Sequence, residues 1–137
     1  GNIKFRAVTV GWNSRMDSIH ADILLHELPK LDSRNARRRQ ITEHYKANIN
    51  LPTQKINADC VPVYHQYALI TDQIKELEDI QTRSYYNTPI HKLNAYNTGQ
   101  ALPVTEYYGK NNVCIPVHPF LSDEQVEYII DKVNECV

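Results

Sequence analysis

The stretch Gly11-Trp12-Asn13-Ser14-Arg15-Met16-Asp17 decides how the rest of this 137-residue chain is arranged. It joins residues 3–10, whose alternating pattern is typical of a strand, to a long segment of helical periodicity. Ser14 followed three residues later by Asp17 is a capping signature, so we predict a helix that begins near Arg15 with Ser14 as its N-cap. Apolar residues recur at helical spacing after it: Met16, Ile19, Ile23, Leu24, Leu28 and Leu31.

Asn13 and Arg15 flank this predicted helix start. The first backbone N–H groups of a helix have no partner within the helix, and together with the helix dipole they attract anions. Capping chemistry alone favours an ordinary helix start at this position. An anion-binding corner is the alternative hypothesis.

The predicted helix continues to about Asn48, with a kink near Leu28 because Pro29 removes one backbone hydrogen bond. Its second half carries a basic cluster, which comprises Arg34, Arg37, Arg38 and Arg39. We interpret this cluster as a solvated helix face paired with Asp32 and Glu43. Nucleic-acid binding is disfavoured, because the net charge is -1 and no binding motif is present.

The remainder of the chain alternates short elements with connections. We predict strands at 61–70, 80–86 and 113–117, a short helix at 71–79, a loop at 87–101 and a helix from Pro103. The capping box Ser122-Asp123-Glu124-Gln125 should open a final helix. One face of that helix is apolar and consists of Val126, Ile129, Ile130 and Val133.

Composition indicates an ordinary soluble globular protein, with 42% hydrophobic and 23% charged residues, and we expect one domain over residues 1–137. No apolar run approaches the ~20 residues of a membrane span, and the N-terminus lacks signal-peptide features. The three cysteines have no metal-ligand spacing, their odd number argues against a disulfide framework, and the histidines suggest no metal cluster. We therefore expect a reduced, cytoplasmic protein without a metal or a membrane partner.

Six segments in one order resemble the DegT/StrS family of pyridoxal phosphate (PLP) sugar aminotransferases, over nearly the whole chain. The first is the Gly11–Asp17 stretch. The others are Leu31-Asp32 with Arg37-Arg38-Arg39 and Tyr45; Tyr64-His65-Gln66-Tyr67; Ile80-x-Thr82 with Tyr85-Tyr86-x-x-Pro89-x-His91; Leu102-Pro103-x-x-Glu106; and Ile115-Pro116-x-His118-Pro119 with Leu121-Ser122-Asp123. The chain departs from the family before Ile80, where the connecting segment is shorter and Asp79 replaces a glycine.

The resemblance implies an α+β fold, the small C-terminal domain of an aspartate-aminotransferase-like (PLP fold type I) enzyme. A long helix should pack on a mainly antiparallel sheet, closed by the C-terminal helix. The implied function is conversion of keto sugars on nucleotide carriers to amino sugars, with an amino acid as amine donor and a site completed across a homodimer. The alternative is a non-catalytic ligand- or partner-binding module derived from the same family.

The resemblance also implies that this chain lacks the lysine that binds PLP in the family. In this family the lysine that binds PLP lies upstream, in an S-x-x-x-x-K-x-x-x-x-G-E-G-G context, and no lysine of this chain has that context. We therefore assign no catalytic residue here and expect the chain alone to be inactive. The sequence leaves open whether it is a fragment or a naturally shortened relative.

For the residues that are present, the resemblance implies particular contacts. Asn13 should donate to the phosphate of the partner subunit's PLP, and Arg15 should either add charge there or pair with Asp17. Tyr86 and His91 should lie beside the nucleotide sugar, although His91 could instead make only local hydrogen bonds.

Two further residues of the matching segments carry weaker expectations. Glu106 should orient the loop that carries His91. For His65, a core histidine is favoured over a ligand, because buried polar groups usually find partners.

Overall fold

The computed structural model describes residues 16–74, 77, 79–96 and 99–137, so Asn13, Arg15 and the strand predicted at 3–10 lie outside the described residues. The chain divides into two compact units, Gly1–Leu31 and Asp32–Val137. The expectation of one domain over the whole chain stays a prediction.

The described part of the first unit is the helix α1, Ser18–Glu27, followed by the 3-10 helix η1, Leu28–Lys30. The predicted N-cap was wrong: α1 begins at Ser18, and the Asp17 carboxylate caps it by accepting from the His20 N–H at 2.9 Å. Aspartate caps as well as serine and also places negative charge at the positive end of the helix dipole. The hydrogen bond from the His20 backbone, joined by its ring, lowers the pKa of Asp17.

The predicted interruption at Pro29 is confirmed. Pro29 lies within η1, and the helix α2, Leu31–Asn48, begins directly after it. Proline has no N–H to donate to the preceding turn, which explains the tighter 3-10 geometry between the two α-helices.

The large apolar side chains of α1 are exposed, from Ile23 and Leu24 in its middle to Ile19, which is 74% exposed. Consecutive residues of an α-helix point about 100° apart, so Ile23, Leu24 and Leu25 together present apolar surface on several sides. A helix that is apolar all round is normally buried within a larger structure.

We expect this surface to cause self-association of the isolated chain, because exposed apolar patches of this kind mark interfaces. Sedimentation should show concentration-dependent oligomers that bind a hydrophobic dye. Replacing Ile23 and Leu24 together by lysine should reduce both signals, whereas Val104→Lys, at another exposed apolar position, should change them little. A strict monomer that binds no dye would contradict the expectation.

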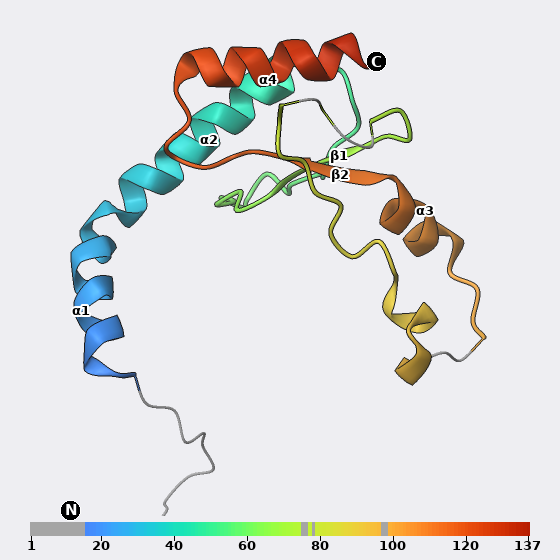
Figure 1. Ribbon diagram of the computed structural model, residues 1–137, viewed down its shortest axis with the longest axis horizontal. Coiled ribbons are helices and arrows are strands. Elements are labelled where there is room, and N and C mark those ends of the chain that lie inside the picture. The colour runs from blue at the N-terminus through green and yellow to red at the C-terminus, as the bar shows by residue number, and fades with distance from the viewer. Residues whose placement is uncertain (1–15, 75–76, 78, 97–98) are drawn as a thin grey trace, which may run out of the picture. The chain divides into compact units, whose positions relative to one another are not determined.

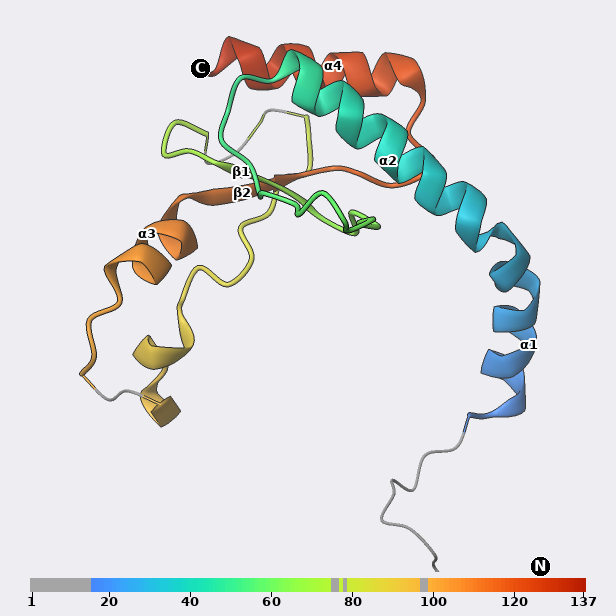
Figure 2. The same ribbon diagram turned by 180° about the vertical axis from the view of Figure 1, so that it is seen from behind.

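In the second unit, α2 and the final helix α4, Asp123–Glu135, cover one face of a two-stranded antiparallel sheet (Figures 1 and 2). The strands are β1, Tyr67–Ile70, and β2, Asn112–Ile115, and their register pairs Ala68 with Cys114. The helix α3, Pro103–Asn111, runs directly into β2. The core forms where the helices meet the sheet and includes Ile41, Tyr45, Tyr67, Leu69, Val113, Ile115, Val126, Ile129, Ile130 and Val133.

The final helix matches its prediction closely. Ser122 and Gln125 form the reciprocal capping box, and α4 buries the four apolar residues that were expected to share a face. The α+β class and the long helix on an antiparallel sheet are likewise confirmed. The helix predicted from Pro103 is α3, and the loop at 87–101 contains two short 3-10 helices, η2 at Ile90–Lys92 and η3 at Asn94–Tyr96.

The predicted strands were too long. The first is limited to β1, because Tyr64 has a φ of 48° and breaks the extended conformation ahead of it. The segment 80–86 pairs with β2 through one bridge, in which Arg83 and Cys114 exchange both backbone hydrogen bonds.

The helix predicted at 71–79 was wrong, since none of its described residues is helical. Ile74 and Leu77 are buried, Leu77 bridges to Ile80, and Asp79 has a φ of 62°. A segment this short cannot repay the cost of helix nucleation, whereas a tight turn buries both apolar side chains. The left-handed conformation of Asp79 agrees with the glycine that the family resemblance places there.

Substitutions of Thr42, a buried residue of α2, test the packing between the helices and the sheet. Its side chain is fully buried, and its Oγ1 has no hydrogen-bond partner in the described part of the chain. An unsatisfied buried hydroxyl costs about 1–3 kcal/mol, so Thr42→Val should raise the free energy of unfolding by about 1 kcal/mol. Thr42→Ser keeps the hydroxyl and loses a methyl group, so it should lower that free energy by about 1 kcal/mol. Urea unfolding of the three proteins measures both changes.

Candidate functional site

Glu106 of α3 connects that helix to the segment that carries His91. One carboxylate oxygen lies 3.1 Å from His91 Nε2 and accepts from the Leu102 N–H at 3.2 Å. The other accepts from Lys92 Nζ at 2.5 Å. Only 9% of the His91 side chain is exposed. Glu106 therefore holds the segment carrying His91, which is the role that the sequence suggested for it.

These contacts stabilise the ionised carboxylate. The hydrogen bond from Lys92, followed by those from His91 and the Leu102 N–H, lowers the pKa of Glu106 to about 2. Glu106 therefore stays ionised around neutral pH and acts as a fixed acceptor rather than as a proton donor.

Tyr86 occupies a strained position at the start of the same segment. Its φ is 58°, which is rare for an aromatic residue, and its side chain is 84% exposed. A Cβ at Gly109 of α3 would lie 3.3 Å from the Tyr86 carbonyl oxygen and 3.3 Å from Pro89 Cγ. Glycine at position 109 thus lets the segment approach α3 closely, which helps to maintain the backbone of Tyr86.

The structure places only some of the residues that the resemblance indicated. Tyr86 and His91 lie in one segment beside α3, one ring exposed and the other largely buried. Asn13 and Arg15 lie outside the described residues. The interpretation of His65 as a core histidine was wrong, because its side chain is exposed.

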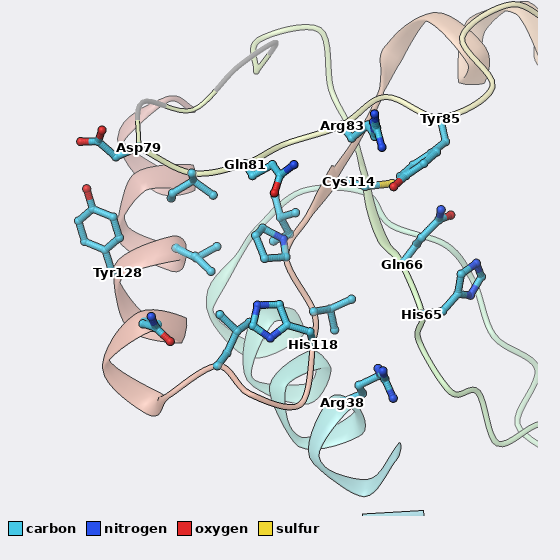
Figure 3. Close-up of a pocket in the computed structure, with 17 residues that line it drawn as sticks. Arg38, His65, Gln66, Asp79, Gln81, Arg83, Tyr85, Cys114, His118 and Tyr128 are labelled. Carbon is cyan, nitrogen blue, oxygen red and sulfur yellow. The ribbon is translucent and has the colours of Figure 1, made fainter. Parts of the chain in front are cut away.

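A pocket of about 500 Å³ lies elsewhere in the second unit, in the size range of small-molecule sites (Figure 3). Its polar lining residues come from several segments: Arg38, His65, Gln66, Asp79, Gln81, Arg83, Tyr85, His118, Gln125 and Tyr128. Its apolar lining is formed by Ile80, Cys114, Ile115, Pro116, Val117, Leu121 and Ile129. We call this the sheet-edge pocket.

The pairing of the strands explains how Cys114 and Arg83 come to line the same pocket. Cys114 is paired with Ala68 on one side and with Arg83 on the other, and paired residues of adjacent strands project to the same face. Val113 belongs to the core, and Ile115 belongs to the core and also borders the pocket. Burial raises the pKa of the Cys114 thiol above its ordinary value.

Sequence patterns did not reveal the sheet-edge pocket. The alternation of Gln81, Arg83 and Tyr85 was the available signal, since it puts three polar side chains on one face of an extended segment. The interpretation of the basic cluster was also incomplete. Arg37 binds Asp123 at 2.6 Å and the Leu121 carbonyl at 2.8 Å, and so joins α2 to the start of α4.

No group of three or more histidine, cysteine, aspartate or glutamate side chains among the described residues could hold a metal ion. Among the same residues, no helix is both long enough and apolar enough to span a membrane.

Comparison with known proteins gives the family. The model of the DegT/DnrJ/EryC1/StrS aminotransferase family matches residues 2–134. The chain belongs to this family. The segments that carried the resemblance therefore indicated the correct group of proteins.

Curated relatives include two sugar-modifying enzymes. The chain is 32% identical to dTDP-3-amino-3,6-dideoxy-alpha-D-galactopyranose transaminase of Aneurinibacillus thermoaerophilus, over 96% of this chain and 39% of that protein. It is 33% identical to GDP-perosamine synthase of Escherichia coli O157:H7, over 92% of this chain and 38% of the relative. The chain thus spans well under half the length of these relatives.

Solved structures agree with the fold. A DegT DnrJ EryC1 StrS aminotransferase from Brucella abortus superposes with a TM-score of 0.83 at 26% identity, covering 98% of this chain and 39% of that one. DesV of S. venezuelae, solved with a ketimine intermediate, gives a TM-score of 0.78 at 29% identity, covering 98% and 40%.

The sheet-edge pocket does not fit covalently attached PLP, because its described lining has no lysine. PLP needs a lysine amine for its covalent attachment. Lys46 is bound to Glu43 and to the Tyr64 hydroxyl, Lys92 is bound to Glu106, and the described lining of the sheet-edge pocket contains no lysine.

The Glu106 contacts predict a pH-dependent stability. The pKa of Glu106 in the folded chain, about 2, lies below its ordinary value of 4.5, so the contribution of this carboxylate is complete above about 4.5 and is lost as the pH falls towards about 2. Glu106→Gln should therefore lower the free energy of unfolding near neutral pH, and the difference from wild type should shrink across that window. Urea unfolding at several pH values measures it.

Lysine substitutions provide the matched control. Lys92→Met removes the largest cause of the shift and should raise the pKa of Glu106. Lys132→Met removes a comparable contact with Glu135 in α4 and should leave the Glu106 titration unchanged. A difference between wild type and Glu106→Gln that is constant with pH would contradict the assignment.

Proposed function

We propose that this chain is the C-terminal domain of a PLP-dependent aminotransferase that converts keto sugars on nucleotide carriers to amino sugars. The observation that carries the proposal is the family match over residues 2–134, combined with a span of 39% of a sugar transaminase. The lysine that attaches PLP is proposed to lie in the part of the enzyme that these residues do not represent.

Within this proposal, PLP supplies the electron sink for amino transfer, and this chain supplies contacts around it. Asn13, with Arg15 beside it, donates to the phosphate of the partner subunit's PLP in a homodimer. Tyr86 and His91 contact the nucleotide sugar. Because His91 Nε2 is engaged by Glu106, its Nδ1 is the ring nitrogen that can face the substrate.

The enzyme is proposed to act in the cytoplasm, with an amino acid as the amine donor. A non-catalytic binding module from the same family is the alternative. The sheet-edge pocket without a lysine in its described lining favours that alternative, since such a pocket could hold a ligand without reacting with it.

The deciding experiment uses the protein from the complete reading frame that contains these 137 residues. It is incubated with PLP, glutamate and dTDP- or GDP-linked keto sugars, and mass spectrometry detects replacement of the carbonyl oxygen by an amino group. We expect amino transfer, and we expect the 137-residue chain alone, treated identically, to give none.

Asn13→Ala in the complete protein should weaken PLP retention about tenfold or more, because a hydrogen bond to a charged group contributes about 1.5–3 kcal/mol. An unchanged PLP affinity combined with a lower melting temperature would instead assign Asn13 to the fold. Absence of amino transfer by the complete protein would favour the non-catalytic module.

A further inference from the structure

The contacts of Glu106 fix which ring nitrogen of His91 carries a proton. One carboxylate oxygen of Glu106 binds Lys92 Nζ, and the other lies 3.1 Å from His91 Nε2. Because the pKa of Glu106 is about 2, this carboxylate is ionised near neutral pH and has no proton to donate. The hydrogen atom of the bond between the two residues is therefore carried by Nε2 of His91.

The second ring nitrogen of His91, Nδ1, remains accessible. It forms no hydrogen bond with the residues that the structure describes, although only 9% of the side chain is exposed. In that part of the chain, Thr42 Oγ1 is the buried side-chain nitrogen or oxygen without a partner, so the exposed part of the His91 ring includes Nδ1. When Nε2 carries the proton of an uncharged imidazole, Nδ1 has a free lone pair and accepts hydrogen bonds.

Lys92 determines whether the His91 ring can stay uncharged. Among the described residues, the ion pairs of Lys92 and of His91 both end on the Glu106 carboxylate. Because the lysine already balances that negative charge, a proton added to Nδ1 would leave a largely buried positive charge without a counter-ion of its own. If Lys92 were absent, the unbalanced carboxylate would favour the doubly protonated ring instead.

We propose that Lys92 is a positioning residue that acts through Glu106 and keeps His91 an uncharged hydrogen-bond acceptor, whose Nδ1 accepts from a hydroxyl group of the nucleotide sugar. Ionised phosphate and carboxylate oxygens have no proton to give, so this nitrogen does not bind them. The choice of the nucleotide sugar as the donor rests on the proposed function. The protonation of the ring rests on the contacts described here.

The first test needs no substrate and uses the 137-residue chain with 15N-labelled histidine. Nuclear magnetic resonance near neutral pH distinguishes protonated from unprotonated ring nitrogens, and the signals lost in His91→Asn identify those of His91. We expect a protonated Nε2 and an unprotonated Nδ1. Protonation of Nδ1 in the unaltered chain, with or without a proton on Nε2, would overturn the inference.

Substitutions of Lys92 test its part in this arrangement. Lys92→Met should increase the fraction of His91 rings that are protonated on both nitrogens, whereas Lys92→Arg, which keeps the charge, should restore the wild-type signals. Lys132→Met removes a comparable contact with Glu135 in α4 and should leave the His91 signals unchanged. Identical His91 signals in wild type and Lys92→Met would overturn the role of Lys92.

Kinetics of the complete protein test the contact with the substrate. Lys92→Met should raise the KM for the nucleotide keto sugar about threefold to tenfold with little change in kcat, because one hydrogen bond to the bound substrate is lost. Lys92→Arg should restore the KM. Amino transfer with an unchanged KM in Lys92→Met would overturn the hydroxyl contact and keep the proposed function. Absence of amino transfer by the unaltered complete protein would overturn the proposed function and leave the protonation of His91 standing.

Discussion

The hydroxyl of Tyr45 donates to the Pro116 carbonyl at 2.8 Å from a side chain with none of its surface exposed. Its ring packs against Tyr67, with 5.4 Å between ring centres, so one residue of α2 contacts β1 and the end of β2 together. Burial, and secondarily Tyr67, raises the pKa of Tyr45, which keeps the hydroxyl protonated as a donor. Because Pro116 also lines the sheet-edge pocket, this contact couples the core to the wall of that pocket.

Local signals predicted the elements whose stability is mostly local. The capping box and the apolar spacing of α4 needed no information from the rest of the chain, and Pro29 interrupts a helix wherever it occurs within one. Local sequence signals failed where tertiary packing decides the conformation of a segment. Residues 71–79 have helix-forming composition, but burial of Ile74 and Leu77 in a turn closed by Asp79 outweighs that preference.

In the candidate site, too, some features could be predicted from the sequence and others depend on tertiary packing. The resemblance to the family indicated Tyr86, His91 and Glu106. The contact between His91 of η2 and Glu106 of α3 agrees with the role expected for Glu106. The strained φ of Tyr86 and the need for glycine at position 109 arise only when two segments approach each other. The sheet-edge pocket combines residues of α2, both strand regions and α4, and sequence periodicity does not predict which segments adjoin.

The three cysteines of the chain differ in their access to solvent, and the buried one is Cys114. Its thiol is buried in the row between Ala68 and Arg83, and its raised pKa keeps it in the unreactive protonated form, whereas Cys60 and Cys136 are exposed. Alkylation of the exposed pair reports on solvent access alone. Cys114 also lines the sheet-edge pocket, so the ratio of the two rates measures how readily a reagent reaches the wall of that pocket compared with free solvent. That ratio can be followed in the unaltered protein, without an introduced label.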